Sequence, residues 1–121
     1  IVIGDNDTLS AEVAAQVSAE LLIILSDIDG LYDSDPHTNP DARLIAEVAV
    51  LDEHIMSLAG GSGSNLGTGG MVTKLRAASI ATEHGCEMVI ANGQKPEVLY
   101  DIVDGKSVGT RFLAHKNKEE R

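Results

Sequence analysis

The sequence has few aromatic residues, a single cysteine and no long apolar run. These shortages exclude an aromatic core, an internal disulfide and a membrane-spanning helix. Aromatic residues make up 2% of the 121 residues and tryptophan is absent, so the core has to be built from aliphatic side chains. Cys86 is the only cysteine, which rules out an internal disulfide and fits a reducing cytoplasm. No apolar run reaches the roughly 18–20 residues that a membrane-spanning helix needs, so we expect no membrane partner.

Positive charge is also scarce, since 9 Lys and Arg stand against 19 Asp and Glu, for a net charge of −10. A general nucleic-acid-binding surface needs clustered Lys and Arg, so we expect no nucleic-acid partner. Acidic groups are suited instead to holding a metal ion. The chain starts at Ile1 without a methionine or a signal-peptide pattern, and we expect it to be part of a longer protein.

A glycine-rich stretch, GGSGSNLGTGGMVTK, runs from residue 60 to 74 and leads into an expected helix. Backbone N–H groups and the positive end of a helix dipole favour phosphate there, and Lys74, about one turn into the helix, could reach a bound anion. The stretch is neither a Walker motif, because Leu75 follows the lysine, nor a dinucleotide motif, because Val72 stands at the third glycine position. A flexible loop without a ligand is the alternative.

Polar residues follow two apolar runs at the start of the chain. Ile1–Ile3 indicates the end of a buried strand and Leu21–Leu25 a parallel strand covered on both faces. Between them we expect a helix over Thr8–Ala19, with Asp7 or Thr8 as its N-cap and with an apolar face at four-residue spacing. That face consists of Leu9, Val13 and Val17.

A strand, a helix and a strand in this order imply a right-handed crossover and a parallel sheet. The residues after each strand, Asp5 to Asp7 and Ser26 to Asp29, should then lie on one edge of that sheet. A capping turn with solvated acids is the alternative at the first of these places. We also expect helices over Asp52–Ala59, from Met71 and over Pro96–Ile102, and strands over Glu87–Ala91 and Val108–Leu113. The fold class is therefore α/β, with a mainly parallel sheet between helices.

Three segments carry a family likeness: GDNDTLSA at 4–11, SDIDGLYDSDP at 26–36 and LGTGGMVTKL at 66–75. They resemble the glutamate 5-kinases of the amino acid kinase family, which use ATP to phosphorylate the γ-carboxylate of glutamate in proline biosynthesis. The resemblance implies a cytoplasmic, homo-oligomeric enzyme with the carbamate kinase-like fold. The family's kinase domain is roughly twice this length, within the usual range of domains. Residues 1–113 would thus be its nucleotide-binding half, followed by a charged tail at 114–121.

The resemblance also implies roles for single residues. Asp7 and Lys74 would be catalytic, with Asp7 orienting the lysines near the transferred phosphoryl group, and Asp5 and Asn6 would bind glutamate. The nucleotide site would consist of Ser26, Asp27, Thr68, Gly69, Gly70, Met71, Val72, Thr73 and Lys74. Aspartates would surround Mg²⁺, although the resemblance does not say which of them are ligands.

The missing amino-terminal half would supply a first lysine, a glycine turn and much of the glutamate pocket, so we expect the chain to be inactive alone. Two alternatives stay open. The chain could be a lobe of a related kinase with another acidic substrate, or a non-catalytic module that assembles through exposed apolar sheet edges. Nothing in the sequence suggests a Ser–His–Asp or Cys–His arrangement, or a set of soft metal ligands.

Overall fold

Three apolar runs form the parallel strands β1 (Val2–Gly4), β2 (Leu21–Ser26) and β4 (Glu87–Asn92) in a computed structural model that describes residues 1–59 and 70–114. Two short strands, β5 (Thr110–Phe112) and β3 (Glu47–Val48), extend the sheet to the order β1-β2-β4-β5-β3. β5 runs antiparallel to β4, whereas β3 runs parallel to β5. The sheet is therefore mainly parallel, as the sequence predicted, with two strands reversed on one side.

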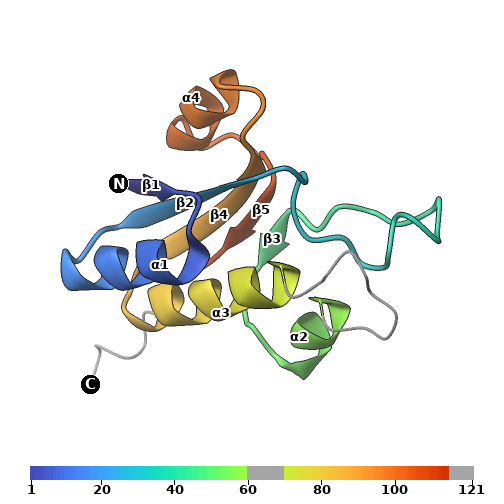
Figure 1. Cartoon of the computed structure of the whole chain (residues 1–121), viewed down its shortest axis with the longest axis horizontal. Helices are drawn as coiled ribbons and strands as arrows, with labels where there is room; N and C mark the ends of the chain where they lie inside the picture. Colours follow the sequence, from blue (N-terminus) through green and yellow to red (C-terminus); the bar gives the residue numbers. More distant parts are fainter. Residues whose placement is uncertain (60–69, 115–121) are drawn as a thin grey trace.

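Helices cover both faces of this sheet (Figure 1). On one face lie α1 (Asp7–Gln16) and α3 (Gly70–Glu83), packed against each other, with α2 (Glu53–Ala59) against α3. On the other face α4 (Glu97–Val103) packs on β4. The predicted sandwich of helices around the sheet is confirmed. No helix among the described residues is long and apolar enough to cross a membrane.

The core is aliphatic apart from Phe112, the largest fully buried side chain. A larger cluster fills the space between the sheet and the α1 and α3 layer, and a smaller one lies under α4. Cys86 is fully buried in the larger cluster, and this burial raises the pKa of its thiol to about 11. A buried thiol with a raised pKa is expected to be unreactive, because the thiolate is the nucleophile.

The helix expected from Met71 is α3, and it buries an apolar stripe at helical spacing that consists of Met71, Leu75, Ala78 and Ala81. The stripe predicted for α1 is wrong. Leu9, Val13 and Val17 are exposed, and α1 buries a different set of residues: Ser10, Ala11 and Ala14. Small side chains on this face let α1 approach α3 and the sheet closely, so the larger apolar residues are turned outward.

The predicted N-cap of α1 is also wrong. Neither Asp7 nor Thr8 caps the helix; the side chain of Asn6 accepts a hydrogen bond from the backbone N–H of Leu9 at 3.0 Å. Asp7 is the first helical residue, and its carboxylate turns toward α3 instead. By contrast, α2 is capped by Asp52, whose carboxylate accepts a 3.0 Å hydrogen bond from the backbone N–H of Ile55.

Candidate functional site

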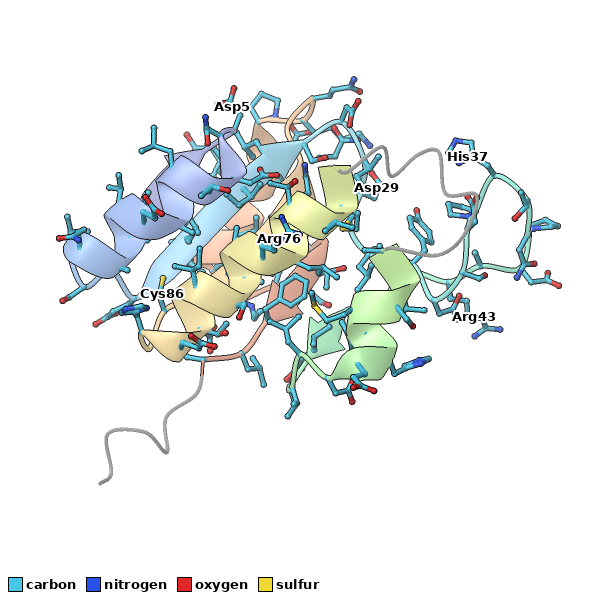
Figure 2. The ribbon with its side chains drawn as sticks, turned by 60° about the horizontal axis from the view of Figure 1, so that its bottom comes forward. Asp5, Asp29, His37, Arg43, Arg76 and Cys86 are labelled. Carbon is cyan, nitrogen blue, oxygen red and sulfur yellow. The ribbon has the colours of Figure 1, made fainter. Side chains whose placement is uncertain are left out.

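The polar residues that follow β1, β2 and β4 lie at one edge of the sheet, which we call the rim (residues 5–7, 26–29 and 92–94). The parallel registers require this, since Gly4 pairs with Ile24 and Ser26 with Asn92. Figure 2 shows Asp5 and Asp29 at this end of the molecule and Cys86 at the opposite end. A hollow of about 460 Å³ opens here, lined by Ile3, Gly4, Asp5, Leu25, Ser26, Asp27, Gly93 and Gln94.

The helix α3 places a lysine at the same rim. It precedes β4 in the chain and lies along the sheet, so its first turn lies at the carboxyl end of the strands. The Lys74 ammonium donates a hydrogen bond to the Asp7 Oδ2 atom at 3.3 Å, across 67 residues of sequence. Both side chains are largely buried, with 15% of Lys74 and 9% of Asp7 exposed. Desolvation strengthens such an ion pair, and it also makes loss of either partner costly.

The second carboxylate oxygen of Asp7 is left without a partner. Oδ1 is buried and has no hydrogen-bond partner among the residues that the structure describes. Buried carboxylate oxygens are nearly always hydrogen-bonded, and an orphaned one calls for an explanation. A further donor at this point would have to come from a ligand or from residues beyond those described.

The turn after β2 is fastened to β4. The Ser26 hydroxyl accepts a bond from the N–H of Ile28 at 3.2 Å. The Asn92 amide donates to Asp29 Oδ1 at 3.1 Å, and the Tyr32 hydroxyl lies 3.4 Å from Asp29 Oδ2. Partial burial, and secondarily the Asp29 charge, raise the pKa of Tyr32 above its ordinary value of 10.0. These contacts hold the turn that carries Asp27 in one position.

A second cavity, of about 330 Å³, lies where the loop after β2 meets α2 and the start of α3. Its wall includes Leu31, Tyr32 and Pro36 from the loop, Leu58 from α2 and Met71 from α3. The sequence does not reveal this cavity, because residues 31–41 are mostly turn-forming. The available signal was Tyr32, one of only two tyrosines, inside the second family-like segment.

Most of the predicted site residues meet at the rim. Asp5, Ser26 and Asp27 line the hollow, and Asp7 and Lys74 form the ion pair beside it. Gly70, Val72 and Thr73 belong to the first turns of α3, where Val72 packs against the core. Met71 faces the second cavity rather than the hollow. Thr68 and Gly69 lie outside the described residues.

The donors at the rim fit a magnesium ion that arrives with a phosphate ligand. Mg²⁺ is usually held by one or two carboxylates together with substrate phosphates and water, rather than by a complete protein cage. Asp5 and Asp27, which line one hollow, supply hard oxygen donors of that kind. Within residues 1–59 and 70–114 no group of three or more His, Cys, Asp or Glu could hold a metal ion, so a complete protein cage is absent from this part of the chain.

Curated relatives share the sequence over almost the whole chain. It is 56% identical to glutamate 5-kinase of Clostridium perfringens, over 95% of this chain and 43% of that protein. It is 57% identical to glutamate 5-kinase of Deinococcus radiodurans, over 99% of this chain and 33% of that protein. The chain thus spans between a third and a little under half of the length of these relatives.

Solved structures agree on the fold. Carbamate kinase of Giardia lamblia superposes with a TM-score of 0.67 at 24% identity, over 92% of this chain and 36% of that one. Uridylate kinase of Archaeoglobus fulgidus gives 0.66 at 24% identity, over 88% and 45% of the two chains. The family model for the amino acid kinase family matches residues 1–92. The chain belongs to the amino acid kinase family.

Proposed function

We propose that this chain is the nucleotide-binding half of a glutamate 5-kinase. Within a longer protein it would take part in the ATP-dependent phosphorylation of the glutamate γ-carboxylate, in the cytoplasm and as a step of proline biosynthesis. The support is the similarity to two glutamate 5-kinases, at 56% and 57% identity, together with a rim whose chemistry suits phosphate. Because the chain spans less than half of those proteins, we expect it to bind nucleotide without turning it over alone.

The ion pair of Lys74 and Asp7 is the observation that carries the proposal. Phosphoryl transfer asks a protein mainly to position groups and to offset charge on the transferring oxygens. Lys74 lies one turn into a 14-residue helix, so its ammonium and the positive end of the helix dipole act on the same place. Asp7 holds that ammonium in position at 3.3 Å and would orient it toward the phosphates.

The proposed site for the nucleotide base is the second cavity. Met71 lines it and stands three residues before Lys74 on α3, so the two side chains lie on one side of the helix about one turn apart. A nucleotide lying along this first turn would put its base in the apolar cavity and its phosphates at the lysine. Ser26 and Asp27, at the rim, would contact the nucleotide from the sheet side.

The proposed site for the amino-acid substrate is the polar turn after β1. The Asn6 side-chain oxygen is occupied by the cap of α1, so its amide N–H groups would be the part of the side chain that donates to a ligand. Amide donors suit a carboxylate, and the neighbouring Asp5 carboxylate suits an ammonium. Glutamate carries both groups. Mg²⁺ bound with the phosphates would be held by rim carboxylates such as Asp5 and Asp27, and would offset phosphate charge.

The test is calorimetric titration of the purified chain with MgATP, comparing Lys74→Ala with Lys106→Ala. Lys106 is a matched control because its side chain is 65% exposed and pairs only loosely, at 3.7 Å, with Asp101. Loss of a charge-assisted contact of about 1.5–3 kcal/mol should weaken binding about 10- to 100-fold in Lys74→Ala. Lys106→Ala should bind as the unchanged chain does.

Circular dichroism of each variant establishes that the fold is kept before the affinities are compared. Equal affinities in Lys74→Ala and the unchanged chain would refute a phosphate role for the lysine. They would favour the alternative of a non-catalytic module that assembles through exposed sheet edges, because nucleotide affinity would then not depend on Lys74.

A further inference from the structure

Two threonines of the described chain, Thr82 and Thr110, are fully buried and use their hydroxyl groups in different ways. The Thr82 hydroxyl donates to the carbonyl oxygen of Ala78 at 2.8 Å, within its own helix α3. The Thr110 hydroxyl, on β5, makes two hydrogen bonds to a distant part of the chain. A buried hydroxyl costs free energy unless it is hydrogen-bonded, so both groups need their partners. Thr110 differs because it joins segments that lie far apart in the sequence.

Thr110 holds both ends of the loop at 31–45. Its Oγ1 atom accepts a hydrogen bond from the backbone N–H of Leu31 at 2.9 Å and donates one to the carbonyl oxygen of Ile45 at 2.6 Å. The two ends also pair with each other, since the N–H of Ile45 donates to the carbonyl oxygen of Leu31 at 2.8 Å. One hydroxyl group therefore fixes the two ends of the loop to the sheet.

Gly30, directly before the loop, allows β5 to come this close. A Cβ atom added at Gly30 would lie 2.7 Å from the Thr110 Oγ1 atom and 3.1 Å from the Thr110 backbone nitrogen. A larger residue at this position would therefore push the hydroxyl away from the N–H of Leu31. The approach of β5 accounts for a glycine here.

The loop that Thr110 anchors forms one wall of the second cavity. Leu31, Tyr32 and Pro36 line the cavity from the loop, together with Met71 of α3. Thr110 is fully buried and does not line the cavity itself. Any effect of Thr110 on a ligand in this cavity must therefore pass through the loop.

The outer part of the loop, which extends beyond the sheet in Figure 1, is stabilised by its own hydrogen bonds. The backbone N–H of Arg43 donates to the Asp33 Oδ1 atom at 2.9 Å, and the N–H of Asp33 donates to the carbonyl oxygen of Arg43 at 3.0 Å. Asp35 Oδ1 accepts a bond from the N–H of His37 at 2.9 Å. A loop with such internal bonds moves as a unit, so the position of its two ends decides where the cavity wall stands.

We propose that Thr110 is a positioning residue for the second cavity, because its hydroxyl fixes the loop wall against which the nucleotide base would lie. The inference rests on the proposed function, which puts the base in this cavity. Thr110 would act through Leu31 and Tyr32 and would not touch the ligand. The phosphates would meet Lys74 at the rim and should not depend on Thr110. Loss of the hydroxyl should thus weaken binding of the base and leave binding of the phosphates unchanged.

Calorimetric titrations with MgATP and with magnesium tripolyphosphate, which has the phosphates without a base, separate the two parts of the site. Thr110→Val replaces the hydroxyl by a methyl group of similar size and leaves the buried N–H of Leu31 unpaired. Thr110→Ser keeps the hydroxyl. Thr82→Val is the matched control, because it removes an equally buried hydroxyl near the far end of α3.

MgATP should bind Thr110→Val about fivefold or more weakly than the unchanged chain, whereas tripolyphosphate should bind both within about twofold. Thr110→Ser and Thr82→Val should bind MgATP within about twofold of the unchanged chain. Equal MgATP affinities in Thr110→Val and Thr82→Val would overturn the proposal. An equal loss of affinity for both ligands in Thr110→Val would also overturn it, because the effect would then be a general loss of structure.

Hydrogen exchange separates failure of this proposal from failure of the proposed function. If the unchanged chain binds neither ligand, or binds both equally, the assignment of the base to the cavity fails, and the role of Thr110 is judged by the backbone N–H of Leu31. Relative to a core N–H such as that of Ile24, it should exchange about tenfold or more faster in Thr110→Val than in Thr82→Val. Equal relative rates would show that Thr110 does not hold the loop.

A second variant covers the case in which circular dichroism finds Thr110→Val unfolded. Gly30→Ala is then measured in its place, because the added Cβ would displace the Thr110 hydroxyl without removing it. The same loss of MgATP affinity, with tripolyphosphate binding unchanged, is expected. Unchanged affinity for MgATP in Gly30→Ala would overturn the proposal.

Discussion

α1 and α3 lie side by side on one face of the sheet, yet they use their apolar residues in opposite ways. The large residues of α3, Met71 and Leu75, point into the core, whereas those of α1, Leu9 and Val13, are exposed. α1 instead buries alanines, which allow it to approach α3. The spacing of large apolar residues thus does not by itself say which face of a helix is buried, because in α1 the small residues mark the buried face.

The largest expected difference between the two helices concerns stability. Leu75→Ala removes a fully buried side chain and leaves a cavity, so it should lower the free energy of unfolding by about 2–5 kcal/mol. Leu9→Ala is the matched control on α1, where the side chain is 57% exposed, and it should change the free energy by less than about 0.5 kcal/mol. Urea unfolding followed by circular dichroism measures both. Similar losses in the two variants would mean that α1 packs its stripe inside the isolated chain.

A smaller effect should follow from enlarging the buried face of α1. Ala14 is fully buried among the residues of the larger core cluster, so Ala14→Leu should cost about 1–3 kcal/mol through overpacking. Ala15, one residue further along and only partly buried, offers Ala15→Leu as the control. The same urea titrations apply. An Ala14→Leu variant as stable as the unchanged chain would show that α1 and α3 are packed loosely.

The strands and their polar ends could be predicted from the sequence because they depend on local pattern. Apolar residues follow one another without a break at Leu21–Leu25, so the strand is buried only when both faces of the sheet are covered. The polar residues after this run end the strand. The orientation of β5 could not be predicted. It depends on the turn before the strand, where Gly109 has φ +66° and an added Cβ would collide with the carbonyl oxygen of Ile90.

The site was predictable only in part from the residues themselves. Asp5 and Asp27 could be predicted to lie at one edge of the sheet, because the carboxyl ends of parallel strands meet there. The pairing of Asp7 with Lys74 spans 67 residues, so no local sequence pattern contains it. The resemblance to a kinase family supplied that prediction. The N-cap was misassigned because three consecutive residues, Asn6, Asp7 and Thr8, can all cap a helix. Asp7 pairs with Lys74 on α3 instead of capping α1, and Asn6 is the N-cap.

Amide chemical shifts of the ¹⁵N-labelled chain, recorded as MgATP is added, test the central claim most directly. The account predicts that the largest changes fall on Ser26, Asp27 and the first turn of α3 up to Lys74, at the rim and the adjoining cavity. Residues at the opposite end of the sheet, such as Cys86, should not change. Shifts that concentrate on the outer flank of α1 or around Cys86, with the rim unchanged, would contradict the assignment of a nucleotide site to Lys74 and its neighbours.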